Sequence, residues 1–213
     1  MRFAAPLLAL GLAVAVPAVI AQSPPAVPGA PDKTRVTAGT YTADPAHTLV
    51  LWEVDHFGFS KYTGLFGQVT GTLVIDPANP AAARVDVTIP VSGVTTASAA
   101  LSSHLLRPGK DGGKPDFFGP APAHATFVST GVVLDADGDE AKVTGNLTLN
   151  GVTRPVTLDV EFHGAGTNPA SKKETIGFEA EATIRRSDFG ILYGIPLVSD
   201  EVELTIHAAF EKQ

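Results

Sequence analysis

Ser103 and His104 are adjacent, and Asp111 follows shortly after, so the residue types of a nucleophile, a base and an orienting carboxylate occur close together. Neighbouring residues on a helix point in different directions, which separates Ser103 from His104. The sequence also lacks the G-x-S-x-G elbow that exposes a nucleophilic serine. We therefore predict no catalytic residues.

Histidine side chains are the candidate metal ligands. None of the six lies in an H-x-x-x-H or similar cluster, and the chain contains no cysteine, so we predict no metal site. No G-x-G-x-x-G motif opens a helix and no P-loop lysine is present, so we predict no cofactor. The histidines are His47, His56, His104, His124, His163 and His207.

The charge balance narrows the range of partners. The 213 residues carry 15 basic and 22 acidic side chains, for a net charge of -7. An acidic protein lacks the attraction to phosphates that nucleic acids require, so no nucleic acid partner is expected. The sequence also lacks a basic patch that would hold it on an anionic membrane. Without cysteines, an exported chain must be stabilised by its own core.

The amino terminus is typical of an export signal. Arg2 precedes a nearly continuous run of Ala, Leu and Val, and residues 1–21 predict a signal peptide cleaved after Ala21, with an uncleaved anchor as the alternative. Residues 22–38 are rich in proline and predict an extended, disordered linker. Residues 39–213 then form one domain, which we expect in the periplasm.

Alternation of apolar and polar residues dominates this domain and predicts half-buried strands. Asn150-Gly151 between two alternating runs is a strong hairpin signal, because both residues tolerate positive φ. About eight short strands at close spacing predict an antiparallel sandwich or barrel. The predicted strands are 48–55, 68–75, 84–89, 124–129, 142–149, 157–162, 174–186 and 201–207.

One segment breaks the alternation. Residues 97–106 are rich in Ala and Leu and predict a short helix, ended by Pro108-Gly109. Asp116-Phe117-Phe118 follows after a loop. The helix with the two phenylalanines is either a lid over one mouth of a barrel or a simple crossover between strands.

The large aromatic side chains at expected inward positions suggest a cavity. An eight-stranded barrel has an interior just large enough for side chains or for one ligand. Small residues along the strands, such as Gly71, Gly145 and Ala180, would leave room beside the aromatic rings. An ordinary packed core is the alternative.

Several segments resemble a known family. The sequence is similar to the YceI-like family of bacterial periplasmic polyisoprenoid-binding proteins from Thr40 to about Phe210, with the family's segments in the same order. The segments that carry the resemblance are 40–48 (TYTADPAHT), 66–73 (FGQVTGTL), 104–105 with 116–118 (HL and DFF), 143–156 (VTGNLTLNGVTRPV) and 186–191 (RSDFGI).

The resemblance implies a lipocalin-like, eight-stranded antiparallel barrel with a long apolar cavity that carries isoprenoid quinone precursors or related amphiphiles. It implies His104 as the contact for a polar head group. The longer link 108–114 and Gly119, where the family has an acidic residue, suggest a differently shaped mouth. The residues implied as contacts for an apolar tail are Trp52, Phe57, Phe66, Phe118, Phe127, Phe178 and Phe189.

We therefore predict a protein that carries or sequesters a long apolar ligand and is not an enzyme. A barrel enzyme that uses His104 or an aspartate as acid–base is the main alternative. An outer-membrane barrel is disfavoured by short strands with charged outer faces, and no stable membrane insertion is expected. A homodimer, a quinone-dependent membrane partner and a protein-binding role are left open.

Overall fold

The computed structural model describes residues 26–213. The predicted signal peptide, residues 1–21, lies outside the described residues. The domain is built almost entirely of strands, with one short α-helix, α1 (Ala99–Leu105). The strands are β1 (Gly39–Ala43), β2 (Leu49–His56), β3 (Ser60–Phe66), β4 (Thr70–Ile75), β5 (Arg84–Ile89), β6 (Thr95–Thr96), β7 (Ala125–Leu134), β8 (Glu140–Leu149), β9 (Val152–Thr167), β10 (Glu174–Arg185) and β11 (Glu201–Lys212).

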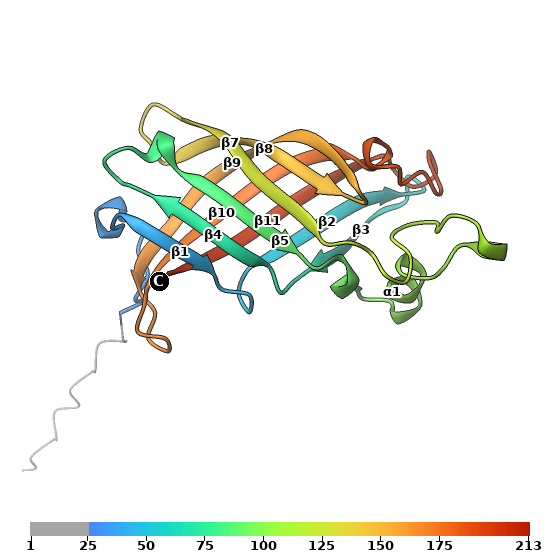
Figure 1. Ribbon diagram of the computed structural model, residues 1–213, viewed down its shortest axis with the longest axis horizontal. Coiled ribbons are helices and arrows are strands. Elements are labelled where there is room, and N and C mark those ends of the chain that lie inside the picture. Colours follow the sequence, from blue (N-terminus) through green and yellow to red (C-terminus); the bar gives the residue numbers. More distant parts are fainter. Residues whose placement is uncertain (1–25) are drawn as a thin grey trace, which may run out of the picture.

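Eight of these strands close into an antiparallel barrel (Figure 1). The ring runs β1-β4-β5-β7-β8-β9-β10-β11 and is closed by β1 against β11, where Tyr41 faces Lys212 and Ala43 faces Phe210. Asn150 and Gly151 have φ of 52° and 75° and form the predicted turn between β8 and β9. The predicted eight-stranded antiparallel barrel is therefore confirmed.

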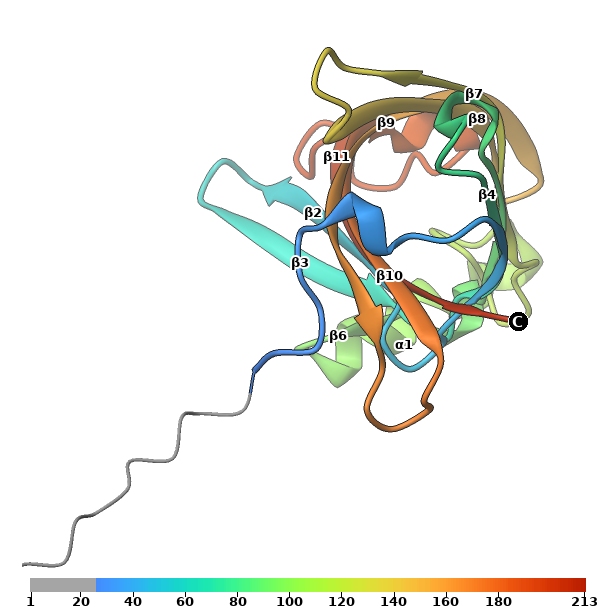
Figure 2. The ribbon, with the colours of Figure 1, turned by 90° about the vertical axis from the view of Figure 1, so that its left-hand side faces the viewer.

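The barrel wall divides along β11. One end of β11 pairs with β1, and its other end, residues 203–207, pairs with β2. Strands β3 and β6 extend β2, and in Figure 2 β2 and β3 leave the ring as a ribbon. The predicted strand 48–55 is thus found as β2, but it lies in this branch, and β1 takes its expected place in the ring.

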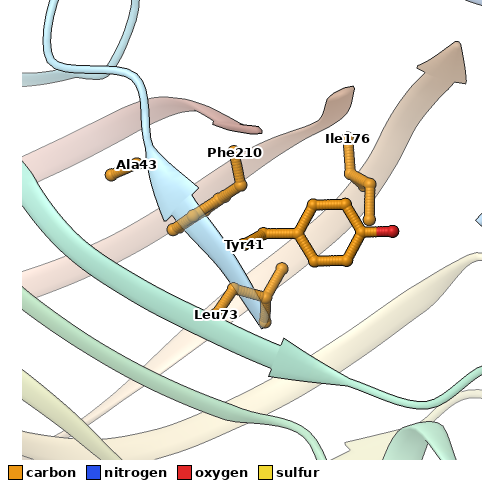
Figure 3. Packing of buried hydrophobic residues seen from close by; sticks show 5 residues of the cluster. All are labelled: Tyr41, Ala43, Leu73, Ile176 and Phe210. Carbon is orange, nitrogen blue, oxygen red and sulfur yellow. The ribbon is translucent and has the colours of Figure 1, made fainter. Parts of the chain in front are cut away.

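Apolar side chains fill the end of the barrel that contains β1. Tyr41 is completely buried, and its hydroxyl donates to the Thr37 carbonyl at 2.8 Å. Figure 3 shows the ring of Tyr41 among Leu73, Ile176 and Phe210. Phe162 and Phe178 pack against this cluster, with ring centroids 6.0 Å apart. We call this the closed end of the barrel.

The predicted linker differs in part from the structure. Ala30 and Ala165 exchange backbone hydrogen bonds of 3.1 and 2.9 Å, and Lys33 forms a 2.7 Å ion pair with Asp139. A side chain at Gly166 would lie 2.2 Å from the Pro28 carbonyl, so glycine permits this close approach. Residues 28–33 therefore pack along β9, because the edge of β9 offers backbone partners that a free linker lacks.

The predicted helix 97–106 is observed as α1. Ser98 caps its amino terminus by accepting a hydrogen bond from the Leu101 amide at 3.3 Å. Figure 1 places α1 at the end of the barrel away from β1. The Phe118 amide donates to the Leu105 carbonyl at 3.0 Å, which joins the helix to the Asp116-Phe117-Phe118 segment.

Candidate functional site

The other end of the barrel contains a cavity of about 700 Å³. Along β10, the closed-end residue Ile176 and the cavity residue Ile184 are separated by eight residues, roughly 26 Å of strand. The cavity therefore lies away from the closed end of the barrel. Its wall is formed by Val50, Trp52, Val54, Tyr62, Phe66, Ile89, Ala125, Leu147, Leu149, Ile184, Val202 and Leu204.

Strand periodicity makes this wall apolar. On β11, Val202 and Leu204 line the cavity while the alternate residues Glu201 and Glu203 are exposed. A strand directs successive side chains to opposite faces, so each alternating segment has an apolar inner face and a charged outer face. The cavity remains because these inner side chains do not fill this end of the barrel.

Trp52 lies flat against the wall. A side chain at Gly64, its cross-strand partner on β3, would lie 2.1 Å from the Trp52 ring. Glycine at position 64 therefore lets the indole lie on the strand instead of filling the cavity. The indole N–H of Trp52 is buried, and no residue of the range 26–213 accepts a hydrogen bond from it.

The mouth of the cavity carries a polar cluster. Asp116 Oδ2 lies 2.8 Å from His104 Nε2 and accepts a 2.6 Å hydrogen bond from Arg107 Nη2. These contacts, first from Arg107 and then from His104, hold the pKa of the Asp116 carboxyl below its ordinary value. The rings of Phe117 and Tyr193 pack edge-on against His104, with centroids 5.2 and 5.3 Å away.

The turn between β2 and β3 forms another side of the mouth. Phe57 has a φ of 59°, a conformation that bulky side chains rarely adopt. Its amide donates to the Leu197 carbonyl at 2.7 Å, and its ring lies 4.2 Å from the His56 ring. These contacts hold Phe57 in the lining of the cavity.

Arg186 anchors the loop that completes the mouth. Its guanidinium donates four hydrogen bonds to backbone carbonyls, those of Ile191, Tyr193, Val198 and Ser199, at 2.8–3.2 Å. Burial of the guanidinium lowers its pKa, although the nearby Asp200 opposes this shift. One side chain thereby fixes residues 191–199 over the barrel end.

Five predicted ligand contacts lie together in this cavity. Trp52 and Phe66 are on the branch formed by β2 and β3, and Phe57 is in the turn between these strands. His104 and Phe118 come from α1 and the segment that follows it. The helix and the two adjacent phenylalanines therefore cover the mouth, as the lid interpretation expects.

The other three predicted contacts lie outside the cavity lining. Phe178 belongs to the closed end, where it packs against Phe162 and Phe210. Phe189 is 1% exposed and packs in one cluster with the cavity residues Ile184 and Val202. Phe127 faces inward but lies over Gly145. All three side chains are buried or half-buried, as their predicted inward orientation requires, and their contact with a ligand stays a prediction.

Sequence reasoning missed Arg186, Tyr193 and Leu197 as lining residues. Arg186 follows the inward-facing Ile184 by two positions, so the alternation itself places this arginine inside the barrel. The segment 191–198 shows no periodicity, and nothing in its sequence indicates that it folds over the mouth.

Two features typical of other protein classes are absent from residues 26–213. This part of the chain contains no group of three or more His, Asp or Glu side chains placed to hold a metal ion. Within the same range, no helix is both long enough and apolar enough to cross a membrane.

The fold and the site together define a class of protein, the closed eight-stranded antiparallel barrel with an apolar cavity at one end. The model of the YceI-like domain matches residues 41–210. The chain is also 42% identical over 161 residues to Protein YceI of Escherichia coli O157:H7, covering 75% of this chain and 79% of that protein. The chain therefore belongs to the YceI-like family, as the sequence motifs predict.

Solved structures share the fold of this chain. The crystal structure of Burkholderia cenocepacia BcnA has a TM-score of 0.65 and 26% identity, and the match covers 78% of this chain and 98% of that one. A polyisoprenoid binding domain from Saccharophagus degradans has a TM-score of 0.54 over 83% of this chain and all of that one. At 15% identity, that second likeness supports the fold alone.

Proposed function

We propose that this protein binds a long-chain apolar ligand, a polyisoprenoid or an isoprenoid quinone, in the cavity at the open end of the barrel and carries or sequesters it in the periplasm. The observation that carries the proposal is the cavity itself, about 700 Å³ of space with an almost wholly apolar wall. This volume lies within the range of known ligand sites, roughly 300–1,000 Å³.

The driving force is the removal of hydrocarbon from water. Each CH₂ group transferred into an apolar interior contributes about 0.8 kcal/mol, so a tail of several isoprene units gains more than ordering it costs. The wall strands offer such an interior, and the closed end of the barrel limits how deep the tail extends.

The mouth suits a polar head group. His104 and Tyr193 line the cavity beside Asp116 and Arg107, so hydrogen-bonding groups lie at the end where a head group would emerge. A ligand with an oily tail and one polar end would satisfy both regions. The family resemblance seen in the sequence implies the same ligand class.

Extraction of the purified protein with organic solvent, followed by mass spectrometry, tests this proposal. We expect an isoprenoid-type lipid at a ratio approaching one molecule per protein. An extract without apolar lipid, from protein that also fails to bind added polyprenols, would contradict it.

A cavity-filling variant localises the binding. Ala125 lines the cavity, whereas Thr126 beside it faces the outer surface of β7. We expect Ala125→Phe to weaken polyprenol binding by at least about tenfold, because displacing only two CH₂ groups already costs that much. The matched control Thr126→Phe should bind as the wild type does in calorimetric titration. Equal affinities for the two variants would place the ligand elsewhere.

A barrel enzyme is the second candidate, and the hydrogen bond between His104 and Asp116 favours it. A carboxylate that orients an imidazole is a common arrangement in general bases. The two functions differ in the behaviour of His104→Ala. In an enzyme this change abolishes turnover of an apolar substrate and leaves affinity largely intact, whereas in a carrier there is no turnover to lose.

A further inference from the structure

The exposed surface around the cavity mouth contains an unusual group of apolar side chains. Phe59 is 89% exposed, and Leu192 and Leu197 are each 63% exposed. Phe57 and Tyr193 are about half exposed and lie beside them. We call these five residues the apolar rim.

Two loops carry the apolar rim, and they lie side by side. His56 forms a β-bridge with Val198, and the Phe57 amide donates to the Leu197 carbonyl. Neither residues 57–60 nor residues 191–198 include a Lys, Arg, Asp or Glu. Across the whole chain 17% of residues are charged, so an uncharged exposed surface of this kind calls for an explanation.

The apolar rim continues into the cavity. Phe57, Tyr193 and Leu197 are exposed to solvent and also line the cavity. An apolar ligand could therefore pass from the outer surface to the interior without contacting a charged side chain of these two loops. Such a continuous apolar surface would let the ligand move between the cavity and an apolar environment that contacts the rim.

We propose that the apolar rim docks transiently into the interface of a lipid bilayer, so that an apolar ligand enters or leaves the cavity without crossing water. This inference rests on the proposed carrier function. The cost of wetting the tail is largest while the ligand crosses from one apolar medium to the other, and contact between the rim and the bilayer removes that step.

The size and shape of the rim favour a bilayer over a protein partner. The exposed parts of the five side chains amount to roughly 600 Å², given about 150–250 Å² for each whole aromatic residue. A stable protein interface takes about 800 Å² from each partner. The rim residues also come from two short loops, 57–60 and 191–198, and exposed Phe and Leu side chains suit insertion into the boundary between head groups and acyl chains.

The net charge of the protein indicates which lipid head groups the rim should tolerate. At -7 the chain is repelled by anionic surfaces, so docking depends on the apolar rim and not on electrostatic attraction. We expect binding to vesicles of zwitterionic phosphatidylcholine, and we expect that added anionic lipid does not strengthen it.

Vesicle flotation tests the proposal. Phe59 and Leu192 are exposed and lie outside the cavity lining, so Phe59→Ser with Leu192→Ser removes rim surface and leaves the cavity unchanged. This double variant should bind phosphatidylcholine vesicles at least about tenfold more weakly than wild type, because even partial burial of one large apolar side chain is worth that factor. The matched control is Val74→Thr with Val133→Thr, two exposed apolar residues on the barrel wall, and it should bind as wild type does.

A labelling experiment gives an independent readout. The chain has no cysteine, so Phe59→Cys and Val133→Cys each provide a single attachment point for an environment-sensitive dye. Vesicles should shift the emission of the dye at position 59 to the blue and leave the dye at position 133 unchanged. A wild type that does not float, equal flotation of the two double variants, or a shift at position 133 alone would overturn the proposal.

Binding of farnesol, a short-chain isoprenoid alcohol, measured without vesicles, separates the two proposals. Farnesol binding without vesicle docking overturns the docking and leaves the carrier function in place. Vesicle docking by a protein that binds neither farnesol nor longer polyprenols overturns the carrier function instead.

Discussion

Asp116 joins two segments that meet at the cavity mouth. Its Oδ2 atom contacts His104 on α1 and Arg107 just beyond the helix. A carboxylate held by two such donors is stabilised in its charged form, which is why its pKa lies below the ordinary value. The arrangement keeps Phe117 and Phe118, the next residues, against the helix that covers the mouth.

This pKa shift predicts a pH-dependent contribution to stability. A carboxyl whose pKa is lower in the folded state stabilises the fold above its unfolded pKa, 3.8, and that stabilisation is lost as pH falls through the folded pKa. The free energy of unfolding of wild type should therefore exceed that of Asp116→Asn above pH 3.8, and the difference should disappear in stronger acid. Denaturant titrations between pH 2 and 6 measure it.

The variant Arg107→Gln is the matched control for this pH dependence. Arg107 is the largest cause of the shift, so its removal should move the loss of stability to higher pH, towards the ordinary aspartate value. A difference between wild type and Asp116→Asn that does not change with pH would show that the ion contacts do not influence stability.

At the residue scale, the sequence predicts which way a side chain faces better than how deep it lies. Alternation correctly assigns Trp52, Phe127 and Phe178 to the interior. It contains no information on position along the barrel axis, so Phe178 falls in the closed end and Trp52 in the cavity. Depth is set by strand register and barrel closure, which are tertiary properties.

At the scale of elements, the pairing of Trp52 with Gly64 controls the size of the cavity. The two residues face each other across β2 and β3, and the indole occupies the space where a side chain at position 64 would be. The same device recurs where Phe127 covers Gly145 on the neighbouring strand. Glycine in a strand is otherwise unfavourable, so its use here has a packing reason.

Gly64→Ala should push the indole into the cavity. The new methyl group would meet the Trp52 ring at 2.1 Å and the Thr95 carbonyl at 2.9 Å, so we expect a loss of about 1–3 kcal/mol in stability and a weaker affinity for polyprenols. Gly67→Ala is the control, because its methyl group would meet only Leu49 at an ordinary 3.6 Å. Thermal unfolding and calorimetric titration measure the two effects, and unchanged ligand affinity in Gly64→Ala would contradict this role.

Strands that show alternation or follow a typical turn sequence are predicted correctly, and strands without either pattern are missed. The alternating runs predict β5, β8, part of β9 and β11, and Asn150-Gly151 predicts a hairpin. Strand β3 is missed because its turn uses Phe57-Gly58 in place of the usual asparagine or aspartate before glycine. Short strand β1 is missed because its partners, β4 and β11, are distant in sequence.

At the scale of the whole molecule, one end of the barrel is packed for stability and the other end contains the cavity. The closed end holds the seam between β1 and β11 together with a well-packed cluster around Tyr41. The open end leaves its interior unfilled and surrounds it with α1 and the loop anchored by Arg186. The open end lacks side chains that fill its interior, and the tightly packed cluster at the closed end stabilises the barrel in their place.

This division predicts that stability and ligand binding can be changed separately. Tyr41→Ala removes the most deeply buried ring of the closed end and should cost about 3–5 kcal/mol, a fall in Tm on the order of 10 °C. Affinity for polyprenols at 20 °C should stay within about twofold of wild type, since Tyr41 lies outside the cavity lining. Calorimetry on the same sample tests both expectations, and a parallel loss of affinity would show that the two ends are coupled.

Trp52 is the single tryptophan of the chain, and its indole N–H lies in the lining of the cavity without a hydrogen-bond partner among residues 26–213. The tryptophan fluorescence of this protein, separated from that of its three tyrosines by selective excitation, therefore originates at one known point of its interior. Binding of the proposed ligand would alter the polarity around that fluorophore, and no second tryptophan would mask the change. The emission of Trp52 would then report occupancy of the cavity, in real time and without a label.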